Sequence, residues 1–88
     1  MGRFEKILQK VLQGTADANI PFQDLRYLLR RLGFDERVRS SHHIFTRSDV
    51  EEILNLQPGG QGKAKPYQAK QVRDVILKYK LGGPPDDE

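Results

Sequence analysis

Apolar positions recur at helical spacing in three parts of the chain. From Phe4 to Leu12 they follow the i, i+3, i+4, i+7 pattern, and Gly14 supplies a stop. A second stripe predicts a helix from about Pro21 to Leu32, with Gly33 as its C-terminal cap. Pro66 is suited to the first position of a third helix. The positions of that helix expected to face inward are Ala69, Val72, Val75, Ile76 and Tyr79.

Between the second and third helices the pattern shortens to the period of two that is typical of strands. The first strand is predicted from Phe34 and Val38, which alternate with Asp35, Arg37 and Arg39. Further strands are predicted at 42–47 and 52–57, with a turn at Ser48-Asp49 and a flexible loop at 58–62. The expected order is α-α-β-β-β-α. This predicts an α+β fold, a three-stranded antiparallel sheet with helices on one face and the other face open.

The period of two also predicts which side chains share the open face. Placing Ile44 inward turns His43, Phe45 and Arg47 outward. Placing Leu54 and Leu56 inward turns Ile53, Asn55 and Gln57 outward. The open face is therefore expected to gather His43, Phe45, Arg47, Asn55 and Gln57. An imidazole, a ring, a cation and two amides together are typical of a nucleotide-binding surface.

The composition limits the chain to one domain with a modest core. It has 88 residues, of which 36% are apolar. Cysteine is absent, which excludes disulfides and thiolate metal sites and makes a reducing cytoplasm the simplest setting. No apolar run is long enough to span a membrane, so no membrane association is expected. We expect a single domain over 1–83, with an extra N-terminal helix at about 3–13, a core at about 21–81 and an acidic, disordered tail at 84–88.

The positive charge is concentrated in the last third of the chain. The net charge is +3, yet six basic residues lie between Gly60 and Lys80 against Asp74 alone. A solvated helix face is the ordinary interpretation of such a cluster. A surface that binds nucleic acid is the functional one.

Two adjacent histidines, His42 and His43, are the only ones in the chain. Imidazole takes and gives protons near neutral pH, which suits general acid–base catalysis. Lys63 and Lys65 flank a glycine-rich loop at a predicted helix N-terminus, where an anion is favoured. Together these features suggest chemistry on a phosphodiester. Two histidines without a carboxylate pair at ligand spacing do not predict a metal site, and no cofactor is expected.

Two stretches resemble the HicA family of bacterial toxins. The first is Ser40-Ser41-His42-His43-Ile44-Phe45, which is similar to the family pattern Gly-Ser-His-His or Gly-Ser-Asn-His followed by an apolar pair. The second runs from Leu54-Asn55-Leu56-Gln57-Pro58 through Gly62-Lys63-Ala64-Lys65-Pro66-Tyr67-Gln68 to Gln71-Val72-Arg73. Together the matches cover roughly Pro21 to Leu81, and the spaced second run makes them more specific than a histidine pair alone.

This resemblance implies a fold like that of double-stranded-RNA-binding domains. It also implies a metal-independent endoribonuclease, an mRNA interferase that cleaves mRNA and is neutralised by a HicB-type antitoxin. The catalytic residue implied is His43, the last position of the Gly-Ser-x-His motif. Ser40 stands where the family has Gly, and Ser takes positive φ only at a cost. We therefore expect either a turn of different construction or a weakened activity.

The chemistry expected is attack by the substrate's own 2′-OH on the adjacent phosphorus, with His43 as general base or acid. His42 and Ser41 are expected to orient the site, with a half-buried, hydrogen-bonded His42. Tyr67 is expected either to stack on a base or to pack under the loop. The RNA-binding residues expected are Lys63, Lys65, Phe45, Arg47, Asn55, Gln57, Tyr67, Lys70 and Arg73. Two alternatives remain open: a non-catalytic RNA-binding domain of the same fold, and an adaptor whose basic face binds an acidic protein.

Overall fold

The computed structural model describes residues 2–82 and confirms the predicted α+β class and the element order. The acidic tail predicted at 84–88 lies outside the described residues. The elements are α1 (Arg3–Gln13), α2 (Phe22–Arg31), β1 (Asp35–Arg39), β2 (His42–Arg47), β3 (Val50–Leu56) and α3 (Pro66–Tyr79). One-turn 3₁₀ helices occupy Asp17–Asn19 and Gly60–Gly62.

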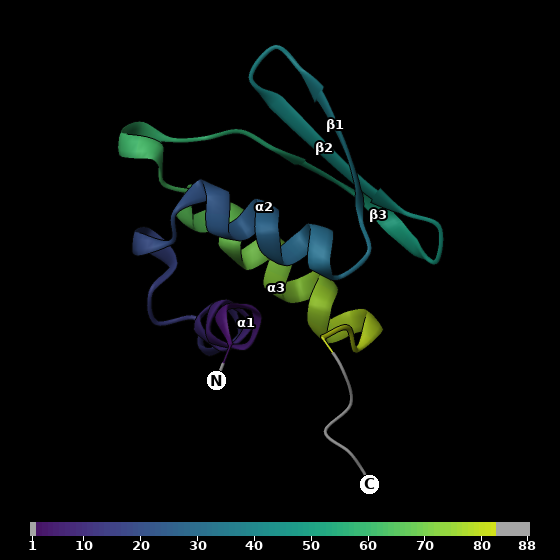
Figure 1. The fold of residues 1–88 in the computed structure, drawn as a ribbon, viewed down its shortest axis with the longest axis horizontal. Coiled ribbons are helices and arrows are strands. Elements are labelled where there is room, and N and C mark those ends of the chain that lie inside the picture. Colours follow the sequence, from purple (N-terminus) through teal and green to yellow (C-terminus); the bar gives the residue numbers. More distant parts are fainter. Residues whose placement is uncertain (1, 83–88) are drawn as a thin grey trace, which may run out of the picture.

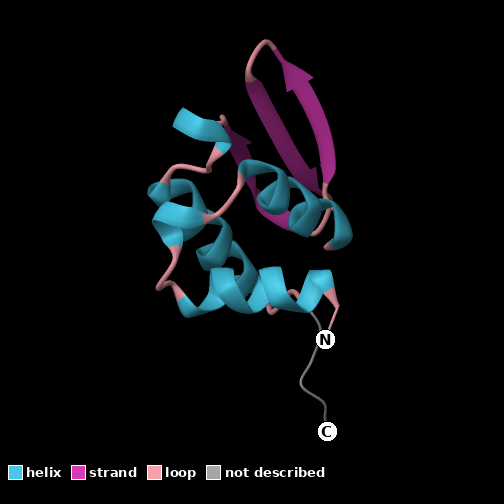
Figure 2. Cartoon of the chain, turned by 60° about the vertical axis from the view of Figure 1, so that its left-hand side comes forward, coloured by secondary structure: helices cyan, strands magenta, loops and turns pink. Residues whose placement is uncertain are grey.

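The three strands form one antiparallel sheet in the order β1-β2-β3. α2 and α3 lie on the same side of this sheet, and α1 packs against them on the side away from the strands (Figure 1). The β1–β2 hairpin extends past the helices, as Figure 2 shows. The predicted arrangement, with helices on one face and the other face open, is therefore confirmed.

The helix ends follow the glycines that the sequence offers. Gly14 caps α1 with φ of 73°, and Gly33 follows α2 with φ of 94°, a left-handed conformation that costs glycine little. The turn at Ser48-Asp49 is also confirmed, but β3 begins at Val50 rather than at Glu52. Val50 is buried and pairs with Arg47 across the turn, which extends the strand by two residues.

The core lies between the sheet and the helices. Its largest fully buried side chains are Phe22, Phe45, Ile20, Leu25, Leu28, Leu29, Leu56, Ile76, Gln68, Val11 and Val72. Each helix supplies one apolar stripe to this core, which is why the amphipathic patterns predicted them well.

The predicted orientation of β2 is wrong. Phe45 is fully buried opposite Leu54, and His43 pairs with Leu56, so both lie on the helix side of the sheet. Ile44 lies on the open face instead, opposite Arg37. An aromatic side chain removes more apolar area from water than an isoleucine, and a shift of one residue turns over every side chain of a strand. The burial of Phe45 therefore decides the orientation of β2.

Candidate active site around His43

His43 lies where the β1–β2 hairpin leaves the helix layer. Its side chain is 15% exposed, whereas Val38, which pairs with it on β1, is 55% exposed. The His43 ring meets the edge of Phe22, the first residue of α2, with ring centroids 5.0 Å apart. His43 is therefore not the fully outward residue predicted, but a half-buried imidazole at the margin of the core.

The carboxylate of Glu36, a residue of β1, binds and orients the imidazole of His43. Nδ1 of His43 lies 2.7 Å from Oε2 of Glu36. Arg26 on α2 donates to both oxygens of the same carboxylate, from Nε at 2.6 Å and from Nη2 at 2.9 Å. The Glu36 side chain is only 7% exposed, so this trio forms largely out of water. Hydrogen bonds from Arg26 and then from His43 lower the pKa of Glu36 to about 2, against the opposing effect of burial.

This geometry determines which nitrogen of His43 faces the Glu36 carboxylate. An ionised carboxylate only accepts hydrogen bonds, so Nδ1 carries the proton that it donates to Glu36. The other nitrogen, Nε2, makes no hydrogen bond to any residue in 2–82. A carboxylate that fixes the tautomer and orientation of an imidazole is the arrangement by which general bases are held in acyl-transfer enzymes. The Arg26–Glu36–His43 trio can therefore present one basic nitrogen in a fixed direction.

Of the two residues predicted to orient the site, His42 lies on the face of β2 opposite to His43, and Ser41 lies in the turn before β2. His42 is exposed, and its Nδ1 lies 3.0 Å from Oδ1 of Asn55. Gln57 donates from Nε2 to Oγ of Ser41 at 2.8 Å. These two pairs join the start of β2 to the end of β3. The prediction of a hydrogen-bonded His42 is confirmed, but the residue is exposed rather than half-buried.

Ser40 adopts the conformation that the glycine of the family pattern would favour. Its φ is 52°, at the first position of a two-residue loop between the paired residues Arg39 and His42. Two-residue hairpins of type II′ place glycine at this position because L-residues are strained there. The turn thus retains its positive φ with Ser40, at a cost in backbone energy.

The segment that carries Lys63 and Lys65, which we name the lysine loop, reaches the same end of the molecule as His43. Lys63 forms an isolated bridge with Pro21, next to Phe22, and the N–H of Ala64 donates to the carbonyl of Ile20 at 2.8 Å. The ammonium of Lys63 donates to Oδ1 of Asn19 at 3.2 Å. Lys65 precedes α3, and its backbone N–H donates to the side-chain oxygen of Gln68.

Two further members of the predicted RNA-binding set lie exposed on the first turns of α3. Tyr67 is 59% exposed, so it does not pack under the loop, and Lys70 is exposed beside Asp74, at 2.9 Å.

Three other members of that set are placed elsewhere by the structure. Phe45 is in the core. Arg47 pairs with Asp49 at the end of β2 opposite to His43. Arg73 is 17% exposed and donates to Asp17 and to the carbonyl of Val11, so it fastens α1 and the segment after it to α3. These three placements follow from packing and ion pairing that the sequence pattern alone does not reveal.

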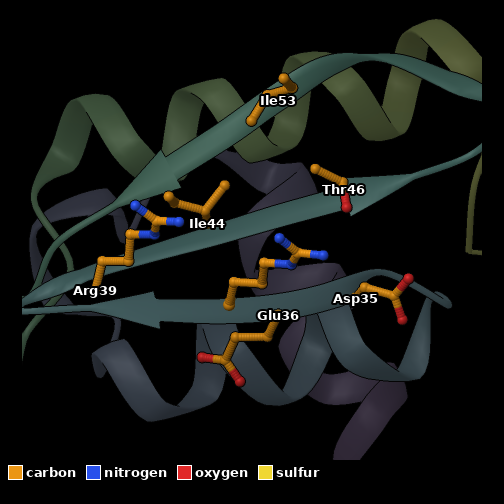
Figure 3. A pocket seen from close by; sticks show the side chains of 7 residues that line it. Asp35, Glu36, Arg39, Ile44, Thr46 and Ile53 are labelled. Carbon is orange, nitrogen blue, oxygen red and sulfur yellow. The ribbon is translucent and has the colours of Figure 1, made fainter.

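The open face of the sheet carries a different set of residues from the one predicted. A shallow hollow of about 700 Å³ lies there. Figure 3 shows its lining: Asp35, Glu36, Arg37, Arg39, Ile44, Thr46 and Ile53. Glu36 extends past the edge of β1 on the side of α2, away from the others (Figure 3). The outward positions of Ile53 and Asn55 are as predicted.

Sequence reasoning missed Glu36, Arg26 and Phe22. The sequence did contain one indication of Glu36. In a strand, the side chains of Phe34, Glu36 and Val38 point to the same face. An acidic residue at an inward position of a strand is unusual unless it is paired or functional. Arg26 and Phe22 offered no such signal, since their approach to β1 and β2 depends on how α2 crosses the sheet.

The chain matches no family model, no curated protein and no solved structure in the comparisons. Within residues 2–82, no helix has the length and apolar character needed to cross a membrane. The same residues contain no group of three or more His, Cys, Asp or Glu placed to hold a metal ion. The geometry around His43 and the resemblance of its motif are what bear on function.

Proposed function

We propose that this protein is an endoribonuclease that cleaves RNA by general acid–base catalysis through His43. The observation that carries the proposal is the 2.7 Å contact between Nδ1 of His43 and Glu36, a carboxylate itself fixed by Arg26. A histidine held in this way has one nitrogen committed to orientation and one available for proton transfer. The resemblance of the surrounding motif to HicA toxins supports the same assignment.

The reaction proceeds through the substrate's own 2′-OH. Nε2 of His43 removes the 2′-hydroxyl proton while O2′ bonds to the adjacent phosphorus. The bond from phosphorus to O5′ breaks, and O5′ takes a proton from water as it leaves. The products are a 2′,3′-cyclic phosphate and a 5′-hydroxyl end. Glu36 stabilises the imidazolium formed in this step, because an opposite charge lies directly beside it.

The lysine loop supplies positive charge at the same end of the molecule. The backbone of Lys63 pairs next to Phe22, which contacts the His43 ring. Lys63 and Lys65 are therefore proposed to bind the RNA backbone near the scissile phosphate and to stabilise charge in the transition state. Tyr67, which is exposed, is proposed to stack on a base.

The biological role proposed from the resemblance is that of a toxin in a toxin–antitoxin module. The substrate is mRNA, the partner is a HicB-type antitoxin, and the setting is the cytoplasm. Induced expression is then expected to arrest growth in the wild type and not in His43→Ala.

A cleavage assay with purified protein tests the activity directly. His43→Ala is expected to lower the cleavage rate by about 10²–10⁴-fold, the usual contribution of a general base or acid. His42→Ala is the matched control, because His42 lies on the other side of the same strand, and its rate is expected to change by less than about tenfold. An RNA with 2′-deoxyribose at the cleaved position is expected to resist cleavage. Equal rates for the two histidine variants would contradict the assignment.

A second variant separates positioning from structure. Glu36→Gln keeps the shape of the side chain but removes the charge that orients the imidazole. Its kcat is expected to fall by about 10²-fold, the cost of a small misplacement, with KM little changed. The thermal unfolding of the variant, measured in parallel, shows what fraction is folded in the assay.

One observation favours the non-catalytic alternative. His43 is only 15% exposed and packs on Phe22, a setting in which a histidine also serves the core. If this is its main role, His43→Ala lowers stability while folded wild-type protein binds RNA without releasing a cyclic phosphate. Analysis of the RNA ends after long incubation distinguishes the two functions.

A further inference from the structure

A second basic surface lies between α1 and α2. None of its residues is among those predicted to bind RNA. It is a hollow of about 480 Å³. Its lining residues are Arg3, Gln23, Arg26, Tyr27, Arg30 and Arg31, and we name it the arginine hollow. Both helices contribute to it, so it exists only because α1 packs against α2.

Tyr27 organises two of these arginines. The guanidinium carbon of Arg3 lies 4.0 Å from the centroid of the Tyr27 ring, and that of Arg31 lies 5.7 Å away. Arg31 also donates from Nη1 to the Tyr27 hydroxyl at 2.9 Å. Stacking occupies the face of a guanidinium and leaves N–H groups at its edge for an anion. The hollow is thus partly arranged before any ligand arrives.

The arginine hollow holds more positive charge than its acidic neighbours balance. Asp24 pairs with Arg3 at 3.4 Å, and Glu36 pairs with Arg26. Arg30 is 64% exposed and only reaches 3.9 Å from Glu36, a carboxylate already shared by Arg26 and His43. Within residues 2–82, Arg31 has no carboxylate partner. Two lysines of α1, Lys6 and Lys10, line an adjoining hollow and add to the field.

A chain of hydrogen bonds links the hollow to His43. Arg26 lines the hollow, donates from Nη1 to Gln23 within it, and donates from Nε to Glu36. Glu36 in turn holds His43. The guanidinium groups of the hollow match phosphate oxygens, so the hollow suits an anionic polymer bound at His43.

We propose that the arginine hollow binds the phosphodiester backbone of the RNA substrate beside the nucleotide that His43 cleaves. This inference rests on the proposed function, because it takes the cleaved phosphate to lie at His43. Arg30 and Arg31 bind phosphate oxygens, Arg3 closes the hollow from α1, and Arg26 connects the hollow to the catalytic histidine. The N-terminal helix thereby gains a role in substrate binding besides packing.

A binding titration tests the hollow separately from catalysis. The probe is a fluorescent single-stranded 2′-O-methyl RNA, which lacks the nucleophilic hydroxyl, measured by anisotropy over a series of salt concentrations. Arg30→Gln combined with Arg31→Gln is expected to weaken binding at least tenfold at 0.1 M salt. The slope of log K against log salt is expected to fall by about 1.4, because each phosphate contact on a single strand contributes about 0.7.

The control variant removes the same charge from the opposite side of the molecule. Arg37→Gln combined with Arg39→Gln alters two exposed arginines on the open face of the sheet. Its affinity is expected to stay within about threefold of the wild type. Equal losses in the two double variants, or a larger loss in the control, would overturn the proposal. Displacement of the RNA by polyglutamate at equal charge concentration would also overturn it, in favour of an acidic protein partner.

The proposed function and this inference fail in different ways. If wild-type protein cleaves RNA and the Arg30→Gln, Arg31→Gln variant cleaves with unchanged KM, the hollow is wrong and the activity remains. If wild-type protein neither cleaves RNA nor binds the 2′-O-methyl probe, the proposed function fails with it.

Discussion

Ser40 holds a backbone conformation that glycine adopts at lower cost. Its φ of 52° places it in the left-handed region, where an L-residue loses about 1–2 kcal/mol. Part of any gain from glycine is offset by the greater freedom of the unfolded chain. We expect Ser40→Gly to raise the free energy of unfolding by about 0.5–1 kcal/mol, measured by urea denaturation.

Ser40→Ala is the control for this prediction. It removes the hydroxyl but keeps the β-carbon, so the strain persists and no gain in stability is expected. A gain with alanine as large as that with glycine would mean that the hydroxyl, rather than the backbone, carries the cost.

The two adjacent histidines show what a residue pattern can and cannot predict. The resemblance implied His43 as the catalytic residue, and the strand period placed His42 on the opposite face, a placement that is confirmed. The strand period assigned the faces the wrong way round, because Ile44 and Phe45 are both apolar and either can be buried. Only the packing of Phe45 under α2 and α3 decides between them. Glu36 alternates in step with Phe34 along the first strand, which the sequence alone shows. It was therefore the better indicator of which face of the sheet is buried.

Among the elements, α1 is joined to α3 by Arg73, which binds the C-terminal end of α1 and the segment after it. Arg73 on α3 donates to Asp17 at 3.0 Å and to the carbonyl of Val11 at 3.1 Å. Gly14 makes room for it, because a β-carbon there would lie 3.0 Å from Nη1 of Arg73. We expect Arg73→Gln to lower the free energy of unfolding by about 2 kcal/mol, since partly buried hydrogen bonds to charged groups are lost.

Lys70→Gln is the matched control on the same helix. Lys70 and Asp74 form an exposed i, i+4 pair with side chains 65% and 58% exposed, and such pairs contribute less than about 0.5 kcal/mol. Both variants lose one positive charge. RNA affinity therefore separates the two interpretations of Arg73: a greater loss of affinity than in Lys70→Gln, with unchanged stability, would restore Arg73 to the RNA-binding set.

Secondary structure was predictable here because each element carries its own local pattern. α1, α2 and α3 each have a stripe at helical spacing and a glycine or proline near an end, and β2 was predicted with its observed bounds. The bridge between Lys63 and Pro21 was not predictable, because it joins residues far apart in the chain through backbone groups. The same holds for the approach of Arg26 to Glu36, which brings together α2 and β1.

For the molecule as a whole, Glu36 couples stability to pH. Its pKa is about 2 in the folded protein against 4.5 ordinarily, mainly because of its hydrogen bonds from Arg26. Between these two values the unfolded state binds more protons than the folded state, so stability falls as the pH falls. The contribution of Glu36 is complete above about pH 4.5 and disappears as the pH approaches 2. For a side chain 7% exposed it amounts to about 3 kcal/mol.

Glu36→Gln is therefore expected to destabilise the protein at neutral pH and to flatten its stability between pH 4.5 and 2, as measured by thermal unfolding across that range. Glu52→Gln is the control, because Lys78 and Tyr79 also lower the pKa of Glu52 to about 2, but at an exposed position. Water screens that pair, so its removal should change the profile much less. If the two variants shift the profile equally, the burial of the Arg26–Glu36–His43 trio contributes nothing to stability.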